Sequence, residues 1–164
     1  MTLPFLKSPI GEQPVIVEGA FRASPERAFL AWTTPEEMIK WFGPGPERIE
    51  DMQIDLRIGG CWCLTYKSKE GVQDKLFGSY LKIETNRHLA FSWAHERRFE
   101  DGRVETTPIS EVNIHFEATD TGVFIKLIHS AIQTQDGRLG VGRGWNASFE
   151  HLDQWFATTK ETAS

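Results

Sequence analysis

One histidine in this chain falls where a side chain with acid–base chemistry would face an apolar interior. His129 is in phase with Val123, Ile125 and Leu127, and alternate residues of a β-strand point to the same face of the sheet. A buried histidine is usually neutral and hydrogen-bonded to its surroundings. It can also orient a bound molecule or act as a general base. We therefore predict His129 as the leading polar contact of an internal cavity, and both roles stay open.

The other histidines and the two cysteines give weaker signals. His115 is out of phase with the apolar side of its strand and His95 is near a hairpin arm, so we predict both at the surface. Cys61 and Cys63 are two residues apart in an expected strand, where a disulfide between them would be strained. No second pair of ligands follows them, as a zinc site would require. We expect two small buried thiols, no metal and no cofactor.

The glycine-rich run at residues 140–144, GVGRG, has only a partial likeness to a phosphate-binding loop. It lacks the spacing of the dinucleotide-binding and Walker motifs. We predict residues 133–140 as a polar loop and the glycine run as the opening of the last helix, at one mouth of the cavity. The alternative is that Arg143 and the helix N-terminus hold an anion. The sequence has no Gly-x-Ser-x-Gly elbow for nucleophilic catalysis.

Aromatic residues are unusually prominent, with six tryptophans in 164 residues. Core packing is the ordinary role of any one of them. Aromatic rings also form pocket walls, because they supply large apolar contact with defined geometry. We predict that a cavity is lined by His129 together with Trp41, Phe42, Trp62, Phe77, Phe91, Trp93, Trp145 and Phe149.

Two helix starts follow each other at residues 21–44 and predict a helical elbow. Ser24 and Thr34 each precede a proline and acidic residues, a pattern that satisfies free backbone donors and complements the helix dipole. A Gly-Pro-Gly-Pro run at 43–46 then ends the second helix. Helices this short need a larger surface to pack against.

The remaining elements are strands followed by one long helix. Seven segments between residues 15 and 129 show strand patterns separated by short turns, which favours an antiparallel meander. Near the C-terminus, Trp145, Phe149, Leu152 and Phe156 follow helical spacing. The predicted fold class is α+β, with a curved antiparallel sheet of six to seven strands wrapped around the C-terminal helix. We expect residues 1–12 to be a poorly ordered tail and 13–160 to form a single domain.

Composition narrows the classes of function. The net charge is −5, which weighs against nucleic-acid binding because that needs concentrated positive charge. No apolar run approaches the roughly 20 residues of a membrane helix, so we expect no membrane insertion. The N-terminal residues lack a signal-peptide pattern. With two cysteines only, a cytoplasmic protein with reduced thiols is the expectation.

Five stretches together resemble a known family. They are FRASPERAFLAWTTPEEMIKWFGP at 21–44, DLRIGGCWC at 55–63, FGSYLKIETNRHLAFSW at 77–93, SEVNIHFEATDTGVFIKLIHS at 110–130 and GWNASFEHLDQWF at 144–156. The chain is similar to the activator of heat-shock protein 90 ATPase homologue-like family, within the START-like, Bet v 1-like (polyketide cyclase) superfamily. The resemblance implies a helix-grip fold with a cavity between the sheet and the last helix.

Three functions are compatible with this sequence. The main hypothesis is binding of a small apolar or amphipathic molecule in the internal cavity. The first alternative is an enzyme of the cyclase or hydrolase type that uses the same cavity. The second is a regulatory or chaperone-interacting module, since the resembled family includes a co-chaperone domain linked to the stress response. The resemblance to this family also implies that a homodimer is possible.

Overall fold

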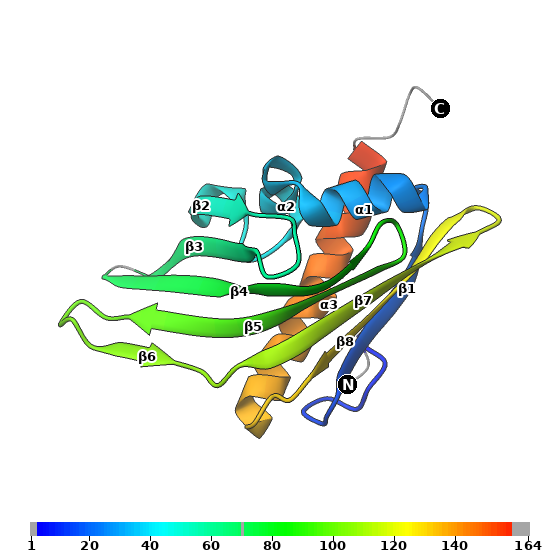
Figure 1. Cartoon of the computed structure of the whole chain (residues 1–164). Helices are drawn as coiled ribbons and strands as arrows, with labels where there is room; N and C mark the ends of the chain where they lie inside the picture. Colours follow the sequence, from blue (N-terminus) through cyan, green and yellow to red (C-terminus); the bar gives the residue numbers. More distant parts are fainter. Residues whose placement is uncertain (1–2, 70, 159–164) are drawn as a thin grey trace.

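A curved antiparallel sheet and a long helix packed across its inner face make up the fold (Figure 1). The computed structural model describes residues 3–69 and 71–158. In chain order the elements are β1 (Val15–Phe21), α1 (Pro25–Thr33), α2 (Pro35–Trp41), the 3-10 turn η1 (Pro46–Arg48), β2 (Ile49–Ile54), β3 (Cys61–Lys69), β4 (Val72–Glu84), β5 (His88–Arg98), β6 (Val104–Thr106), β7 (Ser110–Thr119), β8 (Gly122–Ser130) and α3 (Gln135–Thr158).

The sheet order is β1-β8-β7-β5-β4-β3-β2, with β6 paired to the far end of β5. The predicted α+β class, the elbow after the first strand and the seven long strands are confirmed. One further strand, β6, was not predicted. Its three residues are all exposed, so it carries no alternation that a sequence pattern could reveal. Strands that follow each other in the sequence pair through most of the sheet. The exception is β1, which forms one edge of the sheet by pairing with β8.

The two elbow helices begin where the sequence predicts, but they are capped differently. The Ser24 hydroxyl accepts a hydrogen bond from the backbone N–H of Arg27 at 3.0 Å, which satisfies a free donor of α1. Thr34 occupies the N-cap position of α2 without a side-chain bond to the helix. Glu37 in the first turn of α2 instead forms an ion pair with Arg27, 2.7 Å from its guanidinium, and ties the two helices together.

One close approach in the sheet requires glycine. Gly78 in β4 lies against the backbone of Ser92 in β5, and a Cβ at this position would be 1.8 Å from the Ser92 carbonyl oxygen. That oxygen accepts a hydrogen bond from the Trp62 indole at 3.0 Å. The register of β4 against β5 shifts between Tyr80 and Lys82, close to the bend or bulge that the internal glycine predicts.

The N-terminal segment is held against the domain, in contrast to the expected tail. Leu6 is buried and forms an isolated bridge with Val17 of β1. The backbone N–H groups of Phe5 and Leu6 both donate to Oδ1 of Asn146 on α3, at 2.8 and 3.1 Å. Burial of Leu6 and these two bonds give the segment a defined position that its two prolines and its polar residues do not reveal.

Helix α3 begins at Gln135, so the predicted loop at 133–140 and the glycine run at 140–144 lie largely inside the helix. Glycine disfavours helix, which is why the sequence suggested a loop. Tertiary contacts hold the first turns in place: the Arg138 guanidinium donates to the carbonyl oxygens of Gly11 and Ile132 at 2.7 and 2.9 Å. Thr134 Oγ1 also accepts from the Gly137 N–H.

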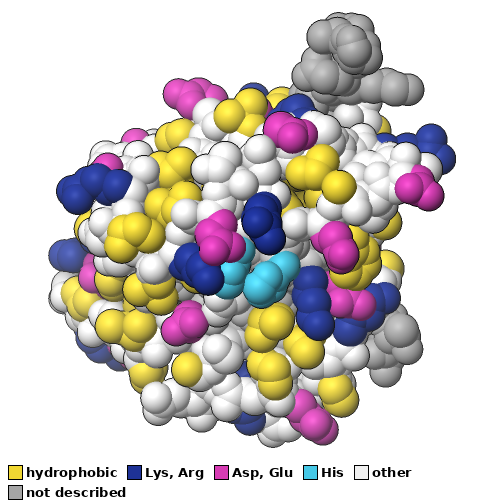
Figure 2. Space-filling view, turned by 45° about the vertical axis from the view of Figure 1, so that its right-hand side comes forward, with side chains coloured by type: hydrophobic (Ala, Val, Ile, Leu, Met, Phe, Trp, Pro, Cys, Tyr) yellow, Lys and Arg dark blue, Asp and Glu magenta, His cyan; other side chains and the backbone are white. Residues whose placement is uncertain are grey.

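The outer face of the sheet is polar and of mixed charge. Figure 2 shows basic and acidic side chains interspersed around two adjacent histidines. His88 and His115 stack there with ring centroids 4.1 Å apart, so the surface position predicted for His115 is confirmed. Cys61 is exposed and Cys63 half-buried on this face, because strand alternation turns Trp62 inward between them. The expectation of two buried thiols is therefore wrong.

Candidate functional site

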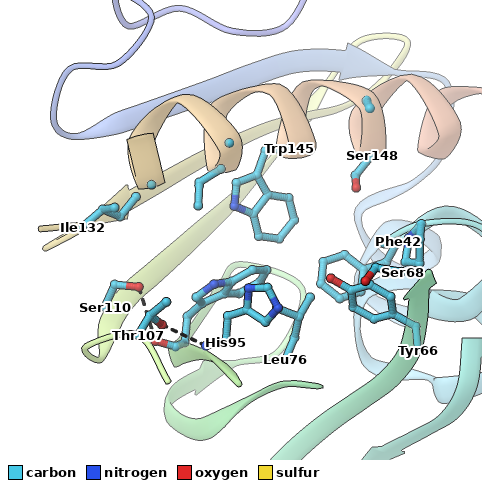
Figure 3. A pocket seen from close by; sticks show the side chains of 18 of the residues that line it. Phe42, Tyr66, Ser68, Leu76, His95, Thr107, Ser110, Ile132, Trp145 and Ser148 are labelled. Carbon is cyan, nitrogen blue, oxygen red and sulfur yellow. Dashed lines mark hydrogen bonds between the residues drawn. The ribbon is translucent and has the colours of Figure 1, made fainter. Parts of the chain in front are cut away.

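A pocket of about 660 Å³ lies between α3 and the inner face of the sheet (Figure 3). Its walls come from the end of the elbow, from β3, β4 and β5, from the segment before β7, and from the first half of α3. The lining residues that the following paragraphs use are Phe42, Arg48, Tyr66, Ser68, Leu76, Trp93, His95, Ser110, Gly137, Gly140, Gly144, Trp145, Ala147 and Ser148.

The pocket exists because α3 presents small residues toward the sheet. Gly137, Gly140, Gly144 and Ala147 are spaced by three, four and three residues, so they share one face of the helix. A Cβ added at Gly140 or Gly144 would meet nothing within 4 Å. Each glycine costs a helix interior about 1 kcal/mol relative to alanine. The helix therefore gives up stability on the face where larger side chains would fill the pocket.

Three aromatic rings form the apolar wall. Phe42, Trp93 and Trp145 contact one another pairwise, with ring centroids 5.3 to 5.9 Å apart. They come from the elbow, from β5 and from α3, so each layer of the fold contributes one ring. Edge and tilted contacts of this kind hold rings in a fixed geometry. The wall is therefore preorganised for an apolar or aromatic group.

The other predicted aromatic residues lie away from the pocket surface. Trp41, Trp62, Phe91 and Phe149 are buried in the core behind it. Phe77 is half-buried on the outer face of the sheet, because its inward-facing neighbour in β4 is Leu76. The structure thus brings Phe42, Trp93 and Trp145 of the predicted set to the pocket, and the rest support or lie outside it.

His129 is completely buried one layer behind the pocket. The Trp145 indole N–H donates to its Nδ1 at 3.1 Å, and because an indole nitrogen can only donate, Nδ1 carries no proton. The proton is therefore on Nε2, which lies 2.7 Å from Ser110 Oγ and donates to it. Ser110 in turn donates to the backbone oxygen of Trp93 at 3.3 Å. This series of hydrogen bonds fixes the positions of Trp145, Ser110 and Trp93, all of which line the pocket.

Burial lowers the pKa of His129 to about 3, so the imidazole is neutral in the folded protein. Its one lone pair is already engaged by Trp145. The arrangement positions pocket residues and leaves His129 without a lone pair for a bound molecule.

The end of the pocket that faces the aromatic wall is polar. It includes His95, which the sequence analysis placed at the surface. His95 lies on the inner face with Trp93 and directly opposite Leu76 of β4. Its Nε2 donates to Oδ1 of Asp74 at 2.6 Å, and its backbone N–H donates to Thr107 Oγ1 at 2.9 Å. The signal was present, because His95 continues the inward phase of Phe91 and Trp93 by two residues.

Asp74 anchors this end from behind. Its side chain is fully buried and accepts hydrogen bonds from His95 and from Arg97 Nε, the latter at 2.8 Å. Burial acts to raise the pKa of Asp74, but the hydrogen bonds from Arg97 and His95 help to outweigh burial, and the pKa is lowered. The carboxylate therefore stays ionised and holds His95 with the proton on Nε2.

The described part of the chain holds neither a cluster of metal ligands nor a helix that could span a membrane. Within residues 3–69 and 71–158, no three His, Cys, Asp or Glu side chains gather as metal ligands. None of the helices in that part of the chain is both long and apolar enough to cross a membrane.

Comparison with known proteins identifies the family. The model of the family described as activator of Hsp90 ATPase homolog 1-like protein matches residues 22–157. The chain belongs to this family. Its resemblance, predicted from five sequence stretches, is thereby confirmed. A search of curated proteins found no match.

Solved structures of the same shape come from several bacteria. An uncharacterized protein of Rhizobium leguminosarum is 20% identical with a TM-score of 0.73, over 88% of this chain and 94% of the other. Protein NE0264 of Nitrosomonas europaea is 21% identical with a TM-score of 0.72, over 90% and 96%. The AHSA1 protein of Silicibacter pomeroyi is 22% identical with a TM-score of 0.71, over 88% and 98%.

At these identities the similarity establishes the fold, which is the predicted START-like, Bet v 1-like helix grip. Membership in the activator of Hsp90 ATPase homolog 1-like family, together with this fold, supports a ligand-binding or regulatory module.

Proposed function

We propose that this protein binds a small amphipathic molecule in the pocket between α3 and the sheet. The observation that carries the proposal is a pocket of about 660 Å³ with a preformed aromatic wall at one side and polar side chains at the other. Pockets for small ligands and cofactors span roughly 300–1,000 Å³ and combine apolar walls with a few placed polar groups. Both features are met here.

The glycine face of α3 favours the same conclusion. Gly140 and Gly144 lower helix stability and leave open space in front of them, where alanine would strengthen the helix. Such a cost at a pocket wall is expected where function requires the space. The buried network of His129, Ser110 and Trp145 supports the proposal further, because it fixes the orientation of Trp145 in the wall.

The first experiment is native mass spectrometry of gently purified protein, followed by the same sample under denaturing conditions. A ligand that is carried through purification appears as extra mass that is lost on denaturation. The second is titration with phenylnaphthylamine, a neutral aromatic probe that fluoresces in apolar sites. We expect saturable binding with one site per chain.

A pair of variants places the probe. Gly144→Phe adds a large ring where the structure has open space and should weaken probe binding by at least about tenfold, since the ring occupies the pocket. Gln154→Phe adds the same ring at an exposed position two turns or more along α3, outside the pocket, and should leave binding unchanged. Equal binding by wild type and Gly144→Phe, or no probe binding and no retained mass in the wild type, would contradict the proposal.

A further inference from the structure

We infer that the ligand of this pocket is an amphipathic organic acid whose anionic group lies at the end formed by Arg48 and Tyr66. The inference rests on the proposed function, because it specifies the ligand of the same pocket. Its evidence is the distribution of charge and of hydrogen-bond donors around the lining.

The lining is depleted of negative charge. It includes Arg48, and the described residues that line it include no aspartate or glutamate. The chain as a whole has 23 acidic residues against 18 lysines and arginines. With Arg48 in the lining and no carboxylate among the described lining residues, the pocket presents a local positive potential to a ligand.

Arg48 supplies a fixed cation at the pocket rim. Its Nε and Nη2 donate to the backbone oxygens of Lys67 and Ser68 at 3.1 and 2.7 Å. These neutral acceptors orient the guanidinium without cancelling its charge. Among the described residues, no carboxylate lies within 4 Å of it, and the Glu50 side chain pairs with Lys67 instead. An oriented guanidinium of this kind binds carboxylate or sulfonate groups well.

A neutral donor lies beside this cation. The Tyr66 ring faces the pocket (Figure 3). Burial, reinforced by the negative charge of Asp74, raises the pKa of the Tyr66 phenol, so its hydroxyl keeps its proton and can donate. A phenol and a guanidinium side by side supply donors suited to an oxyanion.

Asp74 lies behind this end and holds the Nε2 proton of His95 at 2.6 Å. Arg97 donates to the same carboxylate oxygen at 2.8 Å, so its charge offsets part of the negative charge of Asp74. The cation that faces the anionic group of the ligand is therefore Arg48, and the apolar body of the ligand extends toward Trp93 and Trp145.

Two probes that share an aromatic skeleton test the inference. Phenylnaphthylamine is neutral, whereas anilinonaphthalenesulfonate carries one sulfonate, and fluorescence titration gives a Kd for each. Arg48→Gln should raise the Kd of the sulfonate by about tenfold, because a charge-assisted contact is lost, and leave the Kd of the neutral probe within about twofold. Arg143→Gln removes the same charge from an exposed position on α3 outside the pocket and should change neither.

Tyr66→Phe is the second variant, because Arg48 also anchors backbone and its loss could disturb folding, whereas phenylalanine keeps the ring and removes only the hydroxyl donor. It should weaken the sulfonate selectively, by about threefold or more, while urea denaturation confirms that the variant is folded. Loss of both probes in parallel in a folded variant, or no selective effect in either variant, would overturn the inference. Failure of the neutral probe to bind the wild-type protein would instead contradict the proposed pocket function.

Discussion

Acid should destabilise this protein through His129, and replacement of that residue by glutamine should remove the effect. In the folded protein the imidazole is buried, neutral and bonded on both nitrogens. Its pKa is lowered from 6.5 to about 3. The unfolded chain therefore binds a proton below about pH 6.5 that the folded chain does not bind, and the free energy of unfolding must fall as the pH falls.

The magnitude follows from the two pKa values. The stabilisation is fully present above about pH 6.5 and is lost progressively as the pH falls toward 3, at about 1.4 kcal/mol for each pH unit. Between about pH 7.5 and pH 5 the loss is therefore about 2 kcal/mol, which is 1.5 units below 6.5 multiplied by that slope. A small domain has a total stability of about 5–15 kcal/mol, so the loss is easily measured.

The assay is urea denaturation of wild type and His129→Gln at both pH values. Glutamine does not titrate, and its amide can accept from Trp145 and donate to Ser110. Carboxylates and other histidines contribute equally to both proteins, so the difference between the two pH dependences isolates His129. We expect wild type to lose about 2 kcal/mol more than the variant on acidification. Identical pH dependences would refute the reasoning, because His129 would then bind its proton equally in both states.

Three further predictions concern backbone and packing, each measured by urea denaturation. Gly78→Ala should destabilise by about 1–3 kcal/mol or more, because the added Cβ meets the Ser92 carbonyl oxygen at 1.8 Å; an unchanged midpoint would contradict the close approach. Gly144→Ala should stabilise by up to about 1 kcal/mol, since its Cβ enters open space on a helix; a loss of stability would show that the space is filled. Asn146→Ala should cost about 1–3 kcal/mol, because it removes the acceptor of two N-terminal backbone donors, including that of Leu6; no effect would mean that the N-terminal segment is not anchored there.

Local periodicity determined most of the fold. Apolar alternation defined the seven long strands, and the spacing of Trp145, Phe149, Leu152 and Phe156 defined the last helix. Capping residues and prolines placed the elbow helices within the chain. These signals are readable because each depends on neighbours within a few residues.

The same periodicity determined which side chains face inward, but it did not determine their depth. His129 was correctly predicted to face the interior, yet contacts from Trp145 and Ser110 decide that it lies behind the pocket. Among the inward aromatics, only packing against other layers separates Phe42, which lines the pocket, from Phe149, which is covered.

Tertiary structure alone decided where the pocket is and what chemistry it offers. The glycine run at 140–144 became helix because contacts from distant residues outweigh a low local propensity, and its small side then became a pocket wall. His95 gained its orientation from Asp74, which lies 21 residues earlier in the chain and is brought within hydrogen-bond distance by the pairing of β4 with β5. A sequence specifies directions along each element, whereas the volume left between elements depends on how their surfaces meet.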